Sequence, residues 1–339
     1  MTRSPLELTR AQIVAFRRRV GALDERLPRG ARSLRRAAWA GLTDSVPRAA
    51  LLSIHARMEG TQPSSWDDPS LVQLWGPRYS VYVVSARDRA VFTLGRLPDA
   101  PGRRHRAEDM AARVQALLGD RQMKDNDAQH ALGVGNAIKY AATTGTVLLR
   151  WDGARTPLIW TAPAPEVDPH DARGELARRY VHIFGPATPD AFALWAGVPE
   201  AGARATFDAL RTSLTPVRTP IGDAWILTRD EPLIREPVGP TAAARLLPSG
   251  DTYFLLWGSG RELLVPDSAQ RAELWTSRVW PGAVLVGGEI VGTWRRAKHE
   301  LSVQPWRRLT RAERDAVESE AGSLPLPGIE SEIDVRWNG

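Results

Sequence analysis

The sequence predicts an α+β protein in which tandem winged-helix units are followed by a small C-terminal β-domain. Two observations support this class: helix patterns followed by a strand or hairpin occur three times in succession, and strand patterns dominate after residue 240. A third is length, because 339 residues exceed what one ordinary core accommodates. The expected boundaries are 1–105, 106–165, 166–238 and 239–339.

The first unit combines three predicted helices with a strand. Thr9 can cap a helix whose apolar residues recur at near-helical spacing. Further helices are expected over 33–40 and 47–58, the latter with Pro47 in its first turn. The β-rich run 79–84 then predicts a strand.

The second unit begins after residues 99–106, whose Pro, Gly and Arg content is typical of a linker. A helix over 107–118 and a second polar helix are expected next. Two strands within 145–160 would then turn at Asp152-Gly153-Ala154, because Asp-Gly is a strong hairpin signal.

The third unit has the clearest pattern. Thr188 can cap a short helix that ends at Ala196, Gly197 provides the turn, and a second helix covers 199–210. Strands on both sides of the turn 220–223 complete a wing. Any single helix-turn-helix can also be a packing motif that does not touch DNA.

The C-terminal β-domain is predicted from strands over 251–257, 284–286 and 290–294. A compact basic tip, Arg295, Arg296 and Lys298, directly follows its hairpin.

Composition excludes several classes of site. The chain has no cysteine, so disulfides, thiolate zinc sites and cysteine nucleophiles are excluded. Its six histidines lack the close helical spacing of a metal pair, and we expect no metal and no other cofactor. No apolar run approaches the roughly 20 residues of a membrane-spanning helix, and the N-terminus lacks a secretory signal. We therefore expect a cytoplasmic protein that does not bind membranes.

Positive charge is concentrated at the N-terminal end. Residues 1–100 contain 16 arginines against 9 acidic residues, within a chain of net charge +6. This asymmetry suits a phosphate-binding face, because the guanidinium fork matches phosphate geometry. Alternatively, the positive charge forms a solvated surface without a phosphate ligand, in a chain that uses arginine in preference to lysine.

Several short motifs follow one another along nearly the whole chain: Gly41-Leu42, Leu74-Trp75-Gly76-Pro77-Arg78, Leu176-Ala177-Arg178-Arg179-Tyr180, Phe184-Gly185-Pro186-Ala187-Thr188, Leu246-Leu247-Pro248 with Asp251, and Val291-Gly292-Thr293-Trp294-Arg295. In this order and spacing, they resemble those of a known family, the winged-helix DNA glycosylases of bacterial alkylated-base and crosslink repair.

This resemblance implies a basic concave surface around duplex DNA, bearing alkylated bases, and hydrolysis of their N-glycosidic bonds by a metal-independent, monofunctional enzyme. It also implies a monomer associated with the bacterial nucleoid. In the family, two polar side chains in a Gln-x-Gln or Gln-x-Asp pattern do the chemistry. Alignment of that loop puts Thr43 and Ser45 at the two positions, with Asp44 between them.

This departure from the family pattern leaves two hypotheses open. Thr43 and Ser45 are shorter than glutamine and lack a carboxylate's charge, whereas Asp44 could substitute only if the loop were turned. The same three residues also suit a helix cap. The chain is therefore either a glycosylase with an altered catalytic loop or a non-catalytic DNA binder on the same scaffold.

Further DNA contacts are expected around this loop and at the basic tip. Arg48 and Arg78 would hold phosphates near the loop, although Arg78 could instead brace it. Tyr82 replaces a family histidine and could simply pack in its strand. Trp294 likewise has a core alternative beside its DNA-contact role. The full set is Arg48, Arg78, Tyr82, Trp294, Arg295 and Arg296.

Overall fold

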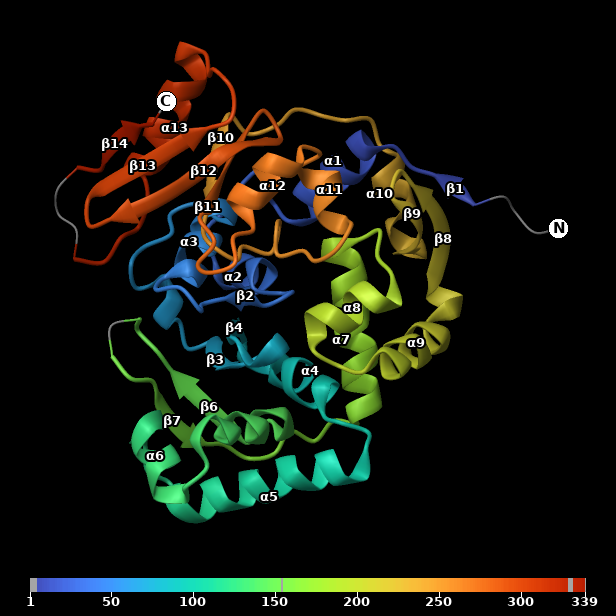
Figure 1. Ribbon diagram of the computed structural model, residues 1–339, viewed down its shortest axis with the longest axis vertical. Helices are drawn as coiled ribbons and strands as arrows, with labels where there is room; N and C mark the ends of the chain where they lie inside the picture. Colours follow the sequence, from blue (N-terminus) through green and yellow to red (C-terminus); the bar gives the residue numbers. More distant parts are fainter. Residues whose placement is uncertain (1–4, 154, 329–331, 339) are drawn as a thin grey trace.

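The computed structural model shows a mixed α/β protein with three β-sheets and describes residues 5–153, 155–328 and 332–338. Figure 1 shows the C-terminal sheet at the upper left, residues 169–235 on the right, and the helices and strands of 101–161 at the bottom.

One six-stranded sheet joins the first two predicted units. Its order is β2-β4-β3-β6-β7-β5, and the two halves meet where Gln73 of β3 pairs with Leu149 of β6. The expected boundary near 105 therefore does not separate two independent sheets. The strands are β2 (Leu42–Thr43), β3 (Leu71–Trp75), β4 (Val81–Ser85), β5 (Met123–Lys124), β6 (Val147–Arg150) and β7 (Leu158–Thr161).

The prediction of a linker over 99–106 is wrong, because helix α5 begins within this range. This helix begins at Pro101, because proline suits the first helical position, and the polar residues that follow form exposed turns. Its apolar stripe packs on the 3-10 helix Gly135–Thr144 and on β7. Other helices of these two units are α2 (Ala31–Ala37), α3 (Ala49–Arg57), α4 (Arg89–Thr93), α5 (Pro101–Leu118) and α6 (Asp125–Leu132). Ala154, the last residue of the predicted turn, lies outside the described residues.

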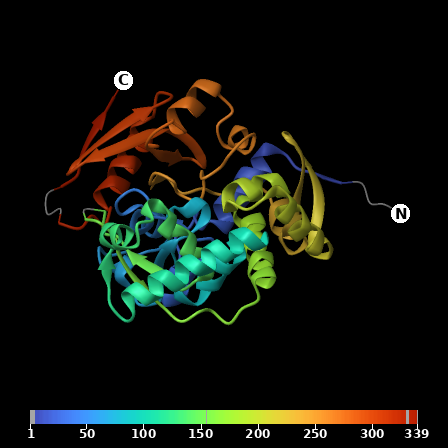
Figure 2. The ribbon, with the colours of Figure 1, turned by 60° about the horizontal axis from the view of Figure 1, so that its bottom comes forward.

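The N-terminal helix α1 (Arg10–Val20) belongs with the third unit, not with the first as expected. Thr9 caps it in a capping box with Gln12, as its sequence predicts. Its apolar face packs against β8 (Leu214–Thr219), β9 (Gly222–Leu227) and α10 (Glu231–Arg235), and β1 (Leu6–Glu7) extends their sheet. Figures 1 and 2 both show this blue segment beside the gold strands.

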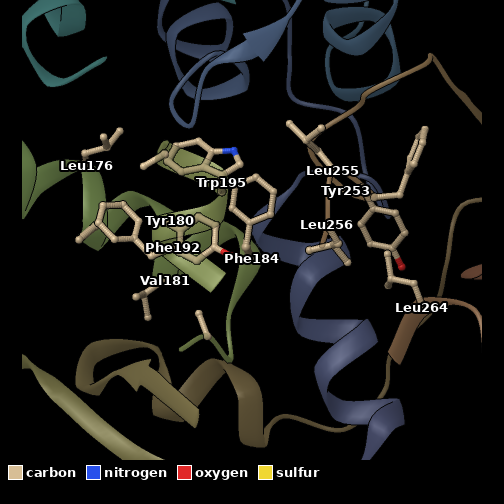
Figure 3. Close-up of a cluster of buried hydrophobic side chains, with 14 of the residues drawn as sticks. Leu176, Tyr180, Val181, Phe184, Phe192, Trp195, Tyr253, Leu255, Leu256 and Leu264 are labelled. Carbon is tan, nitrogen blue, oxygen red and sulfur yellow. The ribbon is translucent and has the colours of Figure 1, made fainter. Parts of the chain in front are cut away.

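The two short helices predicted after residue 188 are present. Thr188 caps α8 (Pro189–Ala196) and Gly197 adopts the left-handed conformation before α9 (Glu200–Ala209). Aromatic rings pack α8 on α7 (Pro169–Phe184): Tyr180 lies 4.9 Å from Phe184 and 5.1 Å from Trp195 between ring centroids. Figure 3 shows this cluster continuing to Leu255 and Leu256 of the C-terminal region.

The C-terminal sheet has the order β10-β11-β12-β13-β14 and is covered by α13. The strand predicted over 251–257 is wrong: Asp251 caps a turn by accepting the Tyr253 N–H, and the chain there runs through turns. The elements are β10 (Ala244–Leu247), α11 (Gly260–Leu264), α12 (Ser268–Leu274), β11 (Gly282–Val286), β12 (Glu289–Ala297), β13 (Glu300–Pro305), α13 (Arg311–Gly322) and β14 (Asp334–Trp337).

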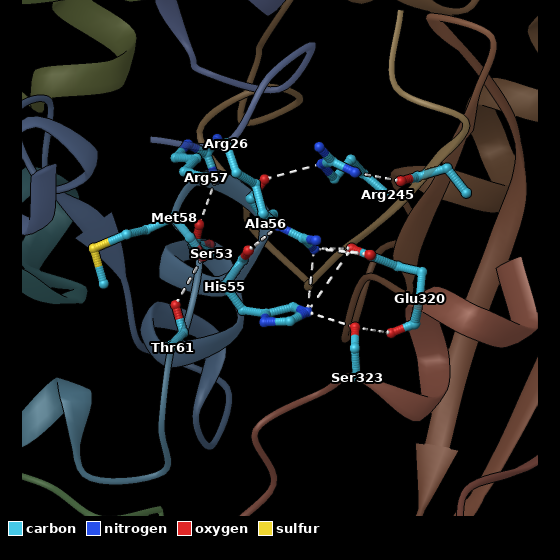
Figure 4. Close-up of polar contacts among 11 residues, drawn as sticks. Arg26, Ser53, His55, Ala56, Arg57, Met58, Thr61, Arg245, Glu320 and Ser323 are labelled. Atoms are coloured by element: carbon cyan, nitrogen blue, oxygen red, sulfur yellow. Dashed lines mark hydrogen bonds and ion pairs between the residues drawn. The ribbon is translucent and has the colours of Figure 1, made fainter. Parts of the chain in front are cut away.

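Helix α3 is buried along its whole length and is tied to the C-terminal region by polar contacts. Arg57 forms a bidentate pair with Asp251, at 2.6 and 2.7 Å, and both side chains are almost fully buried. Ser53 donates a third hydrogen bond to the same carboxylate. Figure 4 shows a second tie, in which His55 and Arg26 meet Glu320 and Ser323 at α13.

Several N-terminal arginines face inward, which corrects the expectation that their charge forms one basic surface. Arg17 donates to the backbone oxygens of Phe184 and Gly185, and Arg96 to those of Trp75 and Ala196. Arg17, Arg18, Arg57 and Arg96 are all buried. These guanidinium groups hold segments that are far apart in the sequence.

Within the described chain, none of the helices combines the length and the apolar character that crossing a lipid bilayer requires.

Replacement of Arg57 by methionine should lower the free energy of unfolding by about 3–5 kcal/mol, because it leaves the Asp251 carboxylate buried without its partner. Urea unfolding measures this change. The matched control is Arg104→Met, which breaks the exposed Arg104–Glu108 pair and should cost less than about 0.5 kcal/mol. Equal losses in the two variants would contradict a dominant role for the buried pair.

Candidate functional site

The predicted active loop leaves β2 at Thr43 and enters α3. Thr43 pairs with Tyr82 of β4, and its hydroxyl donates to the backbone oxygen of Gly250 at 2.8 Å. Gly250 has φ +72°, and a Cβ there would lie 2.7 Å from the Thr43 Oγ1. The close approach therefore requires glycine and fastens the loop to the C-terminal region.

Asp44 points into the protein and is 3% exposed. Its Oδ1 accepts the Ala50 N–H at 3.0 Å, and its Oδ2 accepts the side-chain amide of Gln73 at 2.6 Å. Ala50 lies in the first turn of α3, whose N-cap residue Arg48 makes no side-chain cap. Asp44 thus caps the helix from upstream, as the capping alternative proposed.

Gln73 extends this contact into the second half of the sheet. Its Oε1 accepts the Trp151 N–H at 2.6 Å, and its Nε2 also donates to the Trp151 oxygen at 3.2 Å. Next to it, a Cβ on Gly153 would lie only 2.5 Å from the Cβ of Pro47. The loop is therefore held between α3, β3 and the turn after β6.

Burial raises the pKa of Asp44 to about 6, although the hydrogen bonds from Ala50 and Gln73 and the charges of Arg48 and Arg150 act in the opposite direction. Desolvation penalises the charged form of a carboxyl group more than these neighbours stabilise it. The carboxyl group is therefore mainly ionised at neutral pH and titrates just below it.

Two arginines flank the ring of Trp66 beside this carboxylate. The guanidinium carbon of Arg150 lies 3.6 Å from the ring centroid, and that of Arg48 lies 4.2 Å from it. Arg150 also pairs with Asp67. By contrast, the buried Nη1 of Arg48 has no hydrogen-bond partner among the described residues, and Arg48 itself has φ +66°. An unsatisfied, positively charged donor of this kind can donate a hydrogen bond to an anionic ligand.

Trp66 was not among the residues predicted for the site. It lies in the polar run 61–69, whose proline, serine and aspartate content indicates a connecting segment. A lone tryptophan in such a segment was the available signal, because a large ring seldom remains without a packing partner.

Of the three predicted catalytic residues, Ser45 is the one at the surface, whereas Thr43 and Asp44 are buried. The loop therefore combines the exposed Ser45 with the buried carboxylate of Asp44, on which the charge of Arg48 acts. In the described ranges, no three histidine or acidic side chains converge as metal ligands would.

Arg78 and Tyr82 both support neighbouring structure. Arg78 is exposed and donates to the Leu194 oxygen at the end of α8, at 3.1 Å, so the element it braces is this helix. Tyr82 is 2% exposed, and burial raises the pKa of its hydroxyl well above the usual range. The expected DNA contact of Tyr82 is corrected, because its ring packs against Gly41 and Gly76 and leaves no surface for a duplex.

The DNA contacts predicted at the basic tip and at the neighbouring Trp294 differ in their exposure. Trp294 is 6% exposed and donates its indole N–H to the Leu247 oxygen at 2.9 Å, so its expected DNA contact is also corrected. Arg295 is exposed and donates to the Val279 oxygen, and the half-buried Arg296 donates to the Lys298 oxygen. Trp294 supports the segment that leads to Gly250, and the two arginines remain candidates for phosphate contacts.

Comparison with known proteins relates the chain to DNA glycosylases in sequence and in fold. The family model of AlkZ-like DNA glycosylases matches residues 35–325. An interstrand DNA cross-link repair glycosylase of Streptomyces sahachiroi is 27% identical over 238 residues, which cover 66% of this chain and 62% of that relative's length. The solved structure of the Streptomyces sahachiroi DNA glycosylase AlkZ aligns with a TM-score of 0.79 at 20% identity, over 98% of this chain and 100% of that one. At that identity, the structural match shows the shared fold.

The raised pKa of Asp44 predicts how stability depends on pH. Between the unfolded pKa near 4 and the folded value of about 6, the folded protein holds a proton that the unfolded chain has released. Stability should therefore fall as pH rises through this window, by roughly 3 kcal/mol relative to an Asp44→Asn variant, and level off above it. Urea unfolding of both proteins from pH 4 to 7 measures the difference. Parallel stability curves would contradict the raised pKa.

Proposed function

Because the chain belongs to the family of AlkZ-like DNA glycosylases, we propose that it binds duplex DNA carrying alkylated bases and hydrolyses their N-glycosidic bonds. The observation that carries this proposal is the loop 43–48, where a carboxylate that is ionised near neutral pH lies near the half-buried Arg48, whose buried Nη1 has no hydrogen-bond partner among the described residues.

The chemistry suits a site built from carboxylate, hydroxyl and guanidinium groups. A purine alkylated at N7 is already cationic, so the departing base needs little protonation. What remains is to stabilise an oxocarbenium-like sugar and to position water. Asp44 supplies negative charge from a buried position, where charges interact strongly. Ser45 offers an exposed hydroxyl to water, and Arg48 holds a flanking phosphate.

The proposal extends to the finer architecture. Helices α8 and α9 followed by the β8–β9 hairpin have the order of a winged helix, as do the helices that precede β3–β4 and β6–β7. We propose that these units line a duplex-binding surface on a monomer, with Arg295 and Arg296 reaching the DNA backbone from the C-terminal sheet.

One observation favours a second candidate function, a non-catalytic binder of damaged duplex DNA. The Thr43 hydroxyl and both Asp44 oxygens are already engaged in internal hydrogen bonds. A loop whose polar atoms serve as structural supports can keep the DNA-binding surface in place without performing hydrolysis.

Base release from a duplex that contains N7-methylguanine tests the first function. We expect the wild type to release the base, and Asp44→Asn to reduce the single-turnover rate at least about tenfold, because the stabilising charge is lost. A Thr43→Ala/Ser45→Ala variant should also be slower. Salt-sensitive duplex binding without base release in the wild type would favour the non-catalytic binder.

Replacement of Arg48 by glutamine should weaken duplex binding for all sequences and lower the slope of log K against log salt by about one unit, because one phosphate contact is lost. Fluorescence anisotropy at several salt concentrations measures the slope. Arg311→Gln is the control, since Arg311 is 96% exposed on α13. An unchanged slope in Arg48→Gln would rule out the phosphate contact.

A further inference from the structure

A second pocket, which contains none of the loop residues 43–48, lies between the turn Pro77–Tyr79, the beginning of α5 and the beginning of α9. In Figure 1 the right-hand end of α5 lies below α9 at this point. Its volume is about 580 Å³, within the roughly 300–1,000 Å³ typical of small-molecule sites. The proposed function uses none of the side chains that line it.

Two tyrosines form an aromatic corner in this pocket. The rings of Tyr79 and Tyr140 meet edge to face, with centroids 5.5 Å apart. Tyr79 is held from another side by the buried Arg96, whose guanidinium carbon lies 4.9 Å from its ring. Tyr140 is 48% exposed and is one of few large hydrophobic residues at the surface. The corner therefore combines a fixed ring with an open one on which a planar group can stack.

The backbone at this corner is strained. Arg78 and Tyr79 have φ values of +55° and +57°, which is rare for two successive residues with side chains. Conformations of this kind persist where the surrounding structure enforces them, and they cluster at binding sites. Here they turn the Tyr79 ring toward the pocket that it lines.

Unpaired positive charge lies beside the tyrosines. Arg103 and Arg106, in the first turns of α5, are exposed and have neither a hydrogen-bonded nor an ion-paired side-chain partner in the described part of the chain. Asp99, which also lines the pocket, is neutralised by Arg173 at 2.5 Å. The pocket thus joins open aromatic surface to two cations that are free to bind an anion.

We propose that this pocket binds an unpaired nucleotide, with its base stacked on Tyr140 and its phosphate held by Arg103 and Arg106. Every base offers a π-face, and aromatic platforms with adjacent cations are the usual means of holding unpaired nucleic acid. The nucleotide can come from an unpaired position in a DNA strand or from a free mononucleotide. This binding goes beyond base release and does not depend on it.

The test compares two duplexes that differ in one position, an unpaired 2-aminopurine in one and a paired 2-aminopurine in the other. The wild type should bind the first at least roughly fivefold more tightly, which corresponds to one base stacked on an aromatic side chain. Tyr140→Ala should abolish that preference, and Tyr140→Phe should retain it because the ring remains. Circular dichroism and thermal unfolding show that the variants are folded.

Arg103 and Arg106 allow an independent test of the proposed phosphate contact. An Arg103→Gln/Arg106→Gln variant should lower the salt slope for the unpaired duplex by about one to two units. Arg104→Gln is the matched control, because Arg104 lies on the same helix and pairs with Glu108. A titration with free 2-aminopurine deoxynucleoside monophosphate distinguishes the sources: binding that depends on Tyr140 assigns the pocket to free nucleotides as well.

The proposal is overturned if Tyr140→Ala keeps the preference, if Tyr140→Phe loses it to the same extent, or if the wild type has none. The same duplexes tested with Asp44→Asn separate this site from the proposed enzyme activity. A preference for the unpaired nucleotide that persists in Asp44→Asn shows that the pocket acts independently of base release. The same preference in a wild type that releases no base would support the second pocket while rejecting the first function.

Discussion

The buried ion pair between Arg57 and Asp251 is the contact on which the rest of the arrangement depends. It lies at the end of α3, the helix that is enclosed by the rest of the protein and follows the loop 43–48. A helix in that position must satisfy its polar groups internally, because water cannot reach them. Asp44 does so at its first turn and Arg57 at its last. The loop and the C-terminal segment around Asp251 and Gly250 are therefore positioned by the same helix. The hydrogen bond from Thr43 to Gly250 also joins the loop and this segment directly.

Arginine performs a role here that disulfides perform in many secreted proteins. The chain has no cysteine, and buried guanidinium groups instead join segments that are a hundred or more residues apart. Arg17 reaches the end of α7, and Arg96 reaches the end of α8. A guanidinium group offers five donors in a fixed plane, which suits several backbone oxygens at once. The same property explains why the arginine content of the first hundred residues overstates the charge available to an external ligand.

Local signals in the sequence predicted much of the secondary structure. Thr9 and Thr188 cap helices as expected, Gly197 forms the turn between α8 and α9, and Gly287-Gly288 connects β11 to β12. These features depend on a few neighbouring residues, so a sequence contains them directly. The shared six-stranded sheet and the pairing of α1 with the third unit depend on long-range packing, which local patterns do not encode. For the same reason, the sequence left both a buried and a DNA-contacting position open for Tyr82 and Trp294. A lone Trp66 indicated that its ring needs a packing partner, but no local pattern identified Arg48 and Arg150 as the partners.

Gln73 occupies the seam where the two halves of the large sheet meet, and its side chain links the Trp151 backbone to the Asp44 carboxylate. Gln73 therefore couples the position of β6 relative to β3 to the position of the Asp44 side chain. Any displacement of β6 relative to β3 must stretch or bend the two hydrogen bonds between Gln73 and Trp151, and the same amide group then pulls on Asp44. The electrostatic state of the carboxylate is thereby connected to the geometry between the two halves, so a ligand that spreads or closes them acts on the loop without touching it.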